Sequence, residues 1–330
     1  MRPRSWIYVT GAPRSGTTFV GKVLSVPLNV DYIHEPFNPD CGVQGVDQRF
    51  AYVDPEHADP GWIDRVSSLM AYKARIRTGY YPEDTPARRW IKAVVGSRGP
   101  FYYRLARWNP TSRHAVVKDP IGCLLTEFLA RRFSMRPVVL IRHPAAFVSS
   151  YKRLGWAPQL RALRAQPELA SRYFSDPGLL DETGDPIVDA ARLWTALYTV
   201  LGDQIDRNPD WIVVRHEDLN SAPVATFEQL YGRLGLPWSP RVGRRIVAMT
   251  QGSNRSEAKA SKVQDFRRDS GSLLGLRLAG LSVEEHGAVV RTVAPVALRW
   301  YPDLHTQLEA RQSAQAEPRE ELLLAGGTPA

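Results

Sequence analysis

Residues 6–24 constrain the fold most, because they read as a strand, a glycine-bounded loop and a helix in direct succession. A loop of this kind presents backbone N–H groups and a helix N-terminus, which together bind phosphate or sulfate. The spacing Gly11-x4-Gly16 is that of a P-loop, but Thr17 stands where a nucleotide-binding lysine is expected. A positive charge occurs instead inside the loop, at Arg14. We therefore predict an anion site that does not hold the triphosphate of ATP.

This loop resembles the first loop of the sulfotransferases that use 3′-phosphoadenosine-5′-phosphosulfate (PAPS). In that family it reads Pro-(Lys/Arg)-Ser-Gly-(Thr/Ser)-(Thr/Ser), and here it consists of Pro13, Arg14, Ser15, Gly16, Thr17 and Thr18. The resemblance implies that the loop binds the 5′-phosphosulfate, while Arg14 neutralises charge at the transferring group. The alternative is a glycine turn that only joins a strand to a helix. The match of the whole loop, with its flanking strand and helix, favours the anion site.

A second segment supports the same interpretation. Residues 137–141 form a continuous apolar run, which is typical of a strand buried on both faces of a parallel sheet. Arg142 follows it, at the end of the strand where α/β sheets bind ligands. Ser150 lies eight residues later, about two turns along the predicted helix 145–154. In sulfotransferases an Arg and a Ser with this spacing hold the 3′-phosphate of PAPS, and the resemblance implies that role for Arg142 and Ser150.

A third segment offers candidates for a catalytic base. Residues 30–33 are predicted to form a strand that ends at His34 and Glu35. Pro36 disfavours α geometry at Glu35, which places this carboxylate at a strand end or in a turn. In carbohydrate and tyrosylprotein sulfotransferases a glutamate in this region is the general base, so the resemblance implies this role for Glu35. His34 is the alternative base, and a third possibility is that Glu35 only organises the turn.

Lys118 is the remaining candidate for the chemistry. It ends another short β-branched run, at residues 115–118, and begins a Lys-Asp-Pro triplet similar to one in tyrosylprotein sulfotransferases. There the lysine stabilises the leaving oxygen, as an ammonium group can when negative charge grows on that atom. A solvent-exposed lysine at a strand end is the alternative. Asp119 is predicted to cap a helix over 121–132.

The resemblance implies in-line sulfuryl transfer from PAPS to an acceptor hydroxyl. In this scheme Glu35 accepts the proton, while Arg14, Lys118 and the loop N–H groups stabilise the transferring group. The sequence has no cluster of His, Cys, Asp or Glu at metal-ligand spacing, so no metal is expected. The alternatives are a P-loop nucleotide kinase or phosphotransferase and a non-catalytic anion-binding module.

Short apolar runs alternate with helical segments, a pattern that predicts a three-layer, P-loop-like α/β fold with a mostly parallel central sheet and helical insertions. We expect a single domain over 1–310, with insertions at about 38–112 and 155–190 that shape the acceptor site, and a disordered tail at 311–330. Further predicted elements are a core helix at 190–205, a strand at 211–214 followed by a Glu-Asp-Leu turn, and helices at 223–234 and 283–300.

The first insertion is rich in aromatic residues. They could stack on a sugar or aromatic acceptor, or form the core of a small helical subdomain, and the sequence leaves both possibilities open. The residues are Trp62, Tyr72, Tyr80, Tyr81, Trp90, Tyr102, Tyr103 and Trp108.

The segment 254–268 is the candidate for a further basic loop, which in sulfotransferases holds the 3′-phosphate and covers the adenine. The family's Arg-Lys-Gly triplet is missing from it, so a solvated basic surface is the alternative. The candidate residues are Lys259, Lys262, Arg267 and Arg268.

Composition limits the partners. The net charge of +9 is spread along the chain, which argues for an anionic small ligand or acceptor rather than nucleic acid. Cys41 and Cys123 are the only cysteines, as suits a reducing cytoplasm, and no run approaches the length of a transmembrane segment. With no room for a signal peptide before the first strand, we expect a cytoplasmic bacterial enzyme. Its predicted acceptor is a carbohydrate or a glycosylated or small natural product.

Overall fold

The computed structural model describes residues 3–80, 84–250 and 280–316. Its centre is a five-stranded sheet with the strand order β2-β3-β1-β4-β5, in which every neighbouring pair is parallel. The strands are β1 (Ser5–Thr10), β2 (Val30–His34), β3 (His114–Lys118), β4 (Arg136–Ile141) and β5 (Ile212–Arg215).

The order of the strands creates a switch point beside β1. From β1 the chain passes to the outer strand β2, returns to β3 on one side of β1, and then crosses to β4 on the other side. In an open parallel sheet, ligands bind where the strand order reverses, at the carboxyl ends of the strands. The register brings these ends together, because Lys118 pairs with both Val9 and His34. The fold therefore places the three segments singled out by the sequence at one edge of the sheet.

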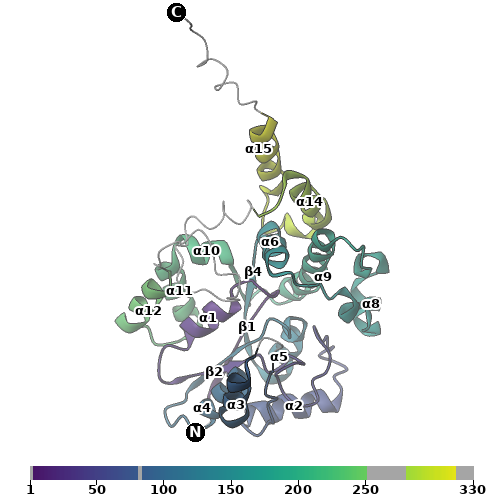
Figure 1. The fold of residues 1–330 in the computed structure, drawn as a ribbon. Helices are drawn as coiled ribbons and strands as arrows, with labels where there is room; N and C mark the ends of the chain where they lie inside the picture. Colours follow the sequence, from purple (N-terminus) through teal and green to yellow (C-terminus); the bar gives the residue numbers. More distant parts are fainter. Residues whose placement is uncertain (1–2, 81–83, 251–279, 317–330) are drawn as a thin grey trace, which may run out of the picture.

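Helices cover both faces of the sheet and give the expected three layers (Figure 1). One face packs against α1, α11 and α12, and the other against α5, α6, α9, α14 and the first insertion. The helices are α1 (Thr17–Leu24), α2 (Pro60–Met70), α3 (Pro86–Val95), α4 (Arg98–Arg107), α5 (Thr126–Phe133), α6 (Pro144–Leu154), α7 (Leu160–Arg164), α8 (Pro167–Tyr173), α9 (Pro186–Arg207), α10 (His216–Ser221), α11 (Pro223–Leu234), α12 (Pro240–Thr250), α14 (Val283–Ala297) and α15 (Leu304–Ala316), with the 3₁₀ turns η1 (Cys123–Leu125) and η2 (Pro177–Leu180).

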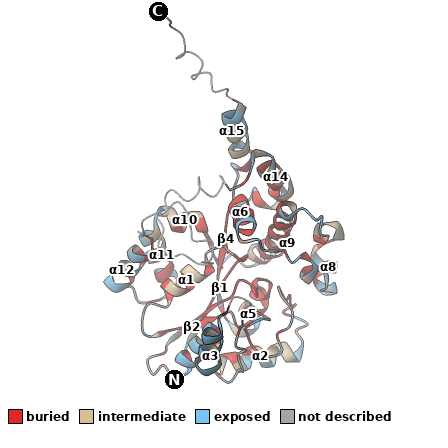
Figure 2. Ribbon diagram, in the orientation of Figure 1, coloured by how far each residue is buried: buried red, intermediate tan, exposed pale blue. Residues whose placement is uncertain are grey.

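Side chains of β1 alternate between the two faces, as the two-residue period of a strand requires. Ile7 and Val9 pack against the α1 and α11 side, whereas Trp6 and Tyr8 pack against the insertion. All four are buried, and Figure 2 shows that buried residues predominate in the central strands of the sheet. Burial on both faces explains why the strands read as continuous apolar runs.

Local signals explain where the long helices begin and end. At the start of α9 the side chain of Asp185 accepts a hydrogen bond from the Ile187 N–H at 2.8 Å, directly before a proline. The end of α11 is set by Gly235, which has a φ of 66° and so adopts the left-handed conformation that favours glycine. A capping box between Ser282 and Glu285 begins α14.

The first insertion is largely a helical layer with a core of its own. Tyr72 and Tyr103 are buried in it, their rings are 5.6 Å apart, and the Tyr72 hydroxyl donates to Asp31. These two side chains therefore stabilise the insertion against β2 rather than contact an acceptor. Trp90 and Trp108, by contrast, are exposed.

The structure differs from the sequence-based expectation in four places. The helix expected over 121–132 is divided into η1 and α5, and the Glu-Asp-Leu turn lies within the short helix α10. Helix α14 ends at Ala297, and α15 continues to Ala316, six residues into the segment expected to be a disordered tail. Amphipathic pattern alone did not reveal α15, because its apolar residues are few.

Candidate functional site

The loop between β1 and α1 has the tight geometry of an anion-binding loop. Gly11 has a φ of 136°, and a Cβ there would lie 2.1 Å from the Leu140 carbonyl oxygen. Gly16 has a φ of 88° and is the N-cap of α1, where a Cβ would lie 2.6 Å from the His216 ring. Since Gly16 has no side chain to cap α1, the first-turn N–H groups face the loop without a side-chain acceptor at the N-cap. Thr17 and Thr18 begin the helix, as the sequence predicts.

A buried tyrosine of α9, Tyr198, holds this loop in place by hydrogen bonds. The Tyr198 hydroxyl donates to the Leu140 carbonyl at 2.8 Å and accepts from the Ala12 N–H at 3.3 Å. A hydroxyl has one proton and two acceptor positions, so the remaining contact, at 3.1 Å, is donated by the Ser15 hydroxyl. The Ser15 side chain is therefore turned into the protein, and only its backbone can face a bound anion. Pro13 lies between these anchored residues.

The two predicted anion-binding segments meet. Arg142, directly after β4, donates from Nη1 to the carbonyl oxygen of Arg14 at 2.5 Å. Arg14 in turn donates from Nε to the Ser150 hydroxyl on α6 at 3.2 Å. Its backbone is left-handed, with a φ of 72°, and its guanidinium lies 5.5 Å from the centre of the Trp156 ring. The structure thus brings Arg14, Arg142 and Ser150 together at one place, as the spacing in the sequence suggested.

The arginine in the loop is largely buried. Burial and the nearby charge of Arg153 lower the pKa of Arg14 to about 10, so the guanidinium remains charged at neutral pH. A charged group that has lost much of its water is a strong partner for an anion, because solvent no longer screens it.

Glu35 lies beside Lys118 at the adjoining strand ends. Lys118 is fully buried, and its ammonium forms an ion pair with Glu35 Oε1. Glu35 Oε2 accepts a hydrogen bond from the Asn38 side-chain amide at 2.8 Å. The backbone of Glu35 is left-handed, with a φ of 46°, and its N–H donates to the Lys118 carbonyl at 2.8 Å. Both oxygens of the carboxylate are therefore held in a fixed orientation.

The charges around Glu35 determine its protonation. Burial alone would raise the pKa of Glu35, but Lys118 and the hydrogen bond from Asn38 outweigh it and keep the pKa well below its usual range. Burial and the Lys118 charge lower the pKa of His34 to about 3, so its ring is neutral at neutral pH. The His34 Nε2 atom lies 3.9 Å from Glu35 Oε1, and Nδ1 is 3.1 Å from the Tyr32 hydroxyl. His34 thus lies next to Glu35, and both are candidates for the base.

Asp119 joins the Glu35 segment to the strand β3. One carboxylate oxygen accepts from the Phe37 N–H at 2.6 Å, and the other accepts from the N–H groups of Ile121 and Gly122 at 2.9 and 3.0 Å. It therefore organises the turn before η1 rather than capping one long helix, which is why the expected helix over 121–132 begins late.

Sequence reasoning missed four neighbours of the site. Tyr198 was hidden in the apolar pattern of a core helix, and Trp156 in an insertion. Asn38 lies three residues after Glu35, and His216 directly follows β5 at the ligand-binding edge of the sheet. These positions in the sequence could have indicated that both residues lie near the site. Arg267 and Arg268, with the whole segment 254–268, lie outside the described residues.

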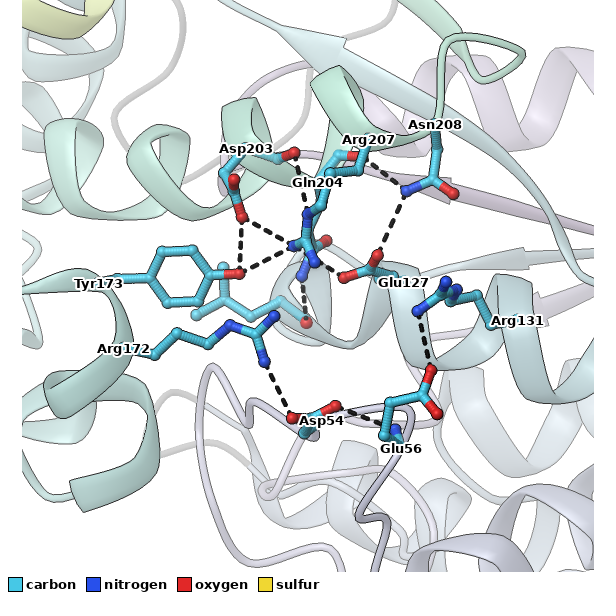
Figure 3. Close-up of polar contacts among 11 residues, drawn as sticks. Asp54, Glu56, Glu127, Arg131, Arg172, Tyr173, Asp203, Gln204, Arg207 and Asn208 are labelled. Atoms are coloured by element: carbon cyan, nitrogen blue, oxygen red, sulfur yellow. Dashed lines mark hydrogen bonds and ion pairs between the residues drawn. The ribbon is translucent and has the colours of Figure 1, made fainter.

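A shallow depression of about 330 Å³ lies elsewhere on the molecule and is lined by Arg172, Tyr173, Thr199, Asp203 and Arg207. Ion pairs and hydrogen bonds fill its floor, including Arg207 with Glu127 and Arg172 with Asp54 (Figure 3). These contacts join α5, α8 and α9 to the first insertion. Arg207 is thirteen residues from Trp194, which binds the Arg142 carbonyl, or roughly 20 Å along α9. We therefore interpret this depression as a structural junction.

Within the part of the chain that the structure describes, no group of three or more His, Cys, Asp and Glu side chains could hold a metal ion. Over the same residues, each helix is too short or too polar to cross a bilayer.

Several solved structures are similar to this chain. The sulfotransferase domain from the curacin biosynthetic pathway is 15% identical, with 95% of this chain and 99% of that chain covered and a TM-score of 0.40. Sulfotransferase STF9 from Mycobacterium avium is 15% identical, with 91% and 77% covered and a TM-score of 0.45. Mouse sulfotransferase SULT7A1, solved in complex with PAP, is 10% identical, with 95% and 91% covered and a TM-score of 0.40. A comparison with curated proteins found no match.

The family model described as the sulfotransferase family matches residues 6–240. This match runs from β1 to the start of α12 and so includes the glycine loop, Glu35, Lys118 and Arg142. The chain therefore belongs to the sulfotransferase family and is an enzyme of the sulfuryl-transferring type.

Proposed function

We propose that the enzyme transfers the sulfuryl group of PAPS to a hydroxyl of a carbohydrate or of a glycosylated or small natural product. The observation that carries the choice of donor is the contact of Arg142 with the Arg14 carbonyl, together with that of Arg14 with Ser150. A donor with phosphate at both ends of one nucleoside needs two anion sites that face the same space. Two guanidinium groups, a hydroxyl and the N-terminus of α1 are suitable donors for such anions.

In this proposal the loop and Arg142 bind the donor, which supplies a sulfuryl group attached to a phosphate leaving group. Arg14 and the N–H groups at the start of α1 stabilise negative charge at the reacting end. Arg142 and Ser150 bind the 3′-phosphate and fix the orientation of the nucleotide. The glycines of the loop support this, because a side chain at Gly11 would collide with β4.

Glu35 is proposed to accept the proton of the acceptor hydroxyl. Its depressed pKa keeps the carboxylate ionised, and the contacts with Lys118 and Asn38 aim it from the end of β2. Lys118 is proposed to stabilise charge on the leaving oxygen, because β3 lies directly beside β1 and its glycine loop.

An aromatic ring beside these groups supports an acceptor with a flat or sugar-like face. Trp156 is exposed and lies next to Arg14. A ring at this position can stack on a sugar or aromatic acceptor near the reacting groups.

Calorimetry with adenosine-3′,5′-bisphosphate tests the proposed donor. We expect binding with a Kd on the order of micromolar that is unchanged when magnesium is removed, since the cations of the site belong to the protein. Magnesium-dependent binding of ATP in preference to this nucleotide would contradict the proposal and favour a phosphotransferase.

Asn38→Asp tests whether the proposed base depends on its neighbour. The Asn38 amide oxygen accepts from the Asp40 N–H at 3.0 Å, so its NH₂ group is the one that faces Glu35. An aspartate at position 38 can still accept the hydrogen bond from the Asp40 N–H. It also places a second negative charge beside Glu35, which raises the pKa of Glu35. Because the base must be ionised, the acid limb of the kcat–pH profile should move to higher pH by about one unit or more. Asn38→Ala removes a hydrogen bond that lowers the pKa of Glu35 but adds no charge, so it should lower kcat by about tenfold with a smaller shift in the same direction. Identical profiles for all three proteins would contradict the role of Asn38.

A further inference from the structure

Helix α3 is amphipathic in the reverse sense to an ordinary surface helix. Its Lys92 side chain is turned inward, where it pairs with the buried Asp84 and donates to the Gly79 carbonyl at 3.0 Å. Three of its apolar side chains point outward, with Trp90 69%, Ile91 53% and Val94 60% exposed. A surface helix normally buries its apolar side and exposes its charges. The opposite arrangement indicates that this surface binds another apolar surface.

Helix α4 continues the same surface. Phe101, Leu105 and Trp108 recur at the spacing of one helix face and are exposed, whereas Tyr103 and Ala106 on the inner side are buried. Only residues 96 and 97 separate α4 from α3, and Figure 1 shows the two helices next to each other at the end of the molecule opposite α14 and α15. The α3–α4 apolar face consists of Trp90, Ile91, Val94, Phe101, Leu105 and Trp108.

The charged residues within α3 and α4 all have one sign. The two helices contain no Asp or Glu, and Arg89, Arg98, Arg104 and Arg107 are exposed on them. Arginines interleaved with Trp, Phe and Leu are typical of helices that lie in the headgroup layer of a membrane, where apolar side chains enter the acyl boundary and guanidinium groups contact phosphates. Protein–protein interfaces are also enriched in Trp, Phe and Arg, so the test below must separate a lipid surface from a second copy of the chain.

We propose that the α3–α4 apolar face docks the protein on a bilayer with anionic headgroups. The inner side of α4 packs on β2, with the Tyr102 and Tyr32 rings 5.0 Å apart. At the start of α4, Gly99 lies against the His34 carbonyl, since a Cβ there would be 3.6 Å from its oxygen. Docking through this face brings the end of β2 close to the lipid surface. If Glu35 is the base, as the proposed function holds, an acceptor carried in that surface is within reach.

Vesicle sedimentation of the full chain tests the docking. We expect at least about tenfold tighter binding to phosphatidylcholine vesicles with about 30% phosphatidylglycerol than to pure phosphatidylcholine vesicles. The triple change Trp90→Ser, Leu105→Ser and Trp108→Ser should weaken binding by about tenfold or more, because it removes the apolar anchors. Arg89→Gln with Arg107→Gln should abolish the preference for the anionic lipid. Matched controls are Arg291→Gln on the distant helix α14 and Leu298→Ser at its C-cap, which should change binding by less than about twofold.

Circular dichroism and thermal unfolding show whether each variant is folded, and this readout does not depend on the proposed donor. The proposal is overturned if the wild type does not sediment with anionic vesicles, or if the triple variant binds them as the wild type does. It is equally overturned if the wild type is a dimer that does not bind vesicles and the triple variant is a monomer in analytical ultracentrifugation. In that case a second copy of the chain covers the α3–α4 apolar face. Vesicle binding without any sulfuryl transfer would leave the docking intact and contradict only the proposed function.

Discussion

We expect Glu35→Gln to lower kcat by about 10²- to 10⁴-fold, the range that a general base contributes, while donor binding is retained. Glutamine keeps the shape of the side chain but cannot take the proton of the acceptor. Its NH₂ group must also face either Lys118 or Asn38, both of which donate to the carboxylate in the wild type. Initial rates with labelled PAPS measure the loss, and calorimetry with adenosine-3′,5′-bisphosphate measures the binding.

His34→Gln is the matched control for this experiment. The histidine lies beside the carboxylate, shares its burial and is neutral, so it is the alternative base. If Glu35 is the base, His34→Gln should lower kcat by less than about tenfold, the cost of a lost hydrogen bond to Tyr32. If His34→Gln lowered kcat by about 10²-fold or more and Glu35→Gln did not, the histidine would be the base.

The second large effect is expected for Arg142→Ala, which should raise the donor Kd by about 10- to 100-fold. Arg142 is buried, and it contributes both a charge and the contact that fixes the Arg14 carbonyl. At saturating donor, kcat should fall less than the donor affinity does, because the group is proposed to bind the 3′-phosphate and to affect the reacting end only through the Arg14 carbonyl. Calorimetry and the dependence of the rate on donor concentration separate the two effects.

Arg136→Ala provides the control, because Arg136 lies at the other end of the same strand. It donates to the carbonyl oxygens of Arg233 and Leu234, away from the glycine loop. The change removes the same unit of charge, so a general electrostatic effect on an anionic donor would appear in both variants. Equal weakening by Arg136→Ala and Arg142→Ala would contradict a specific site at the end of β4.

Much of the site was visible in the sequence because its residues are tied to local structure. The two glycines and Thr17 mark a strand–loop–helix unit, and Arg142 directly follows an apolar run that is typical of a buried strand. In a parallel sheet such strand ends meet at one edge, so a residue's place in its own segment indicates its place in the fold. The assignments of Glu35 and Lys118 to this edge depend on the same reasoning.

Other features could not be read from the chain, because they depend on segments far apart in it. Tyr198 binds Ser15 across 183 positions, and nothing in the helix that carries it distinguishes its hydroxyl from an ordinary core side chain. The exposure of the α3–α4 apolar face was equally hidden, since an amphipathic helix has the same sequence whichever side it buries. The aromatic residues of the first insertion accordingly divide between core and surface.

The sequence by itself determined the strand–loop–helix unit around Gly11 and Gly16, the alternation of strands and helices, and the types of charged residue at the strand ends. It could do so because backbone geometry and hydrophobic period are local properties. Only the tertiary structure decided that Lys118 pairs with Glu35, that Ser15 faces inward to Tyr198, and that α3 presents its apolar side to the outside. These features depend on which surfaces meet when the chain packs. The free energy of packing comes from contacts between residues that are far apart in the sequence, so no local pattern reveals them.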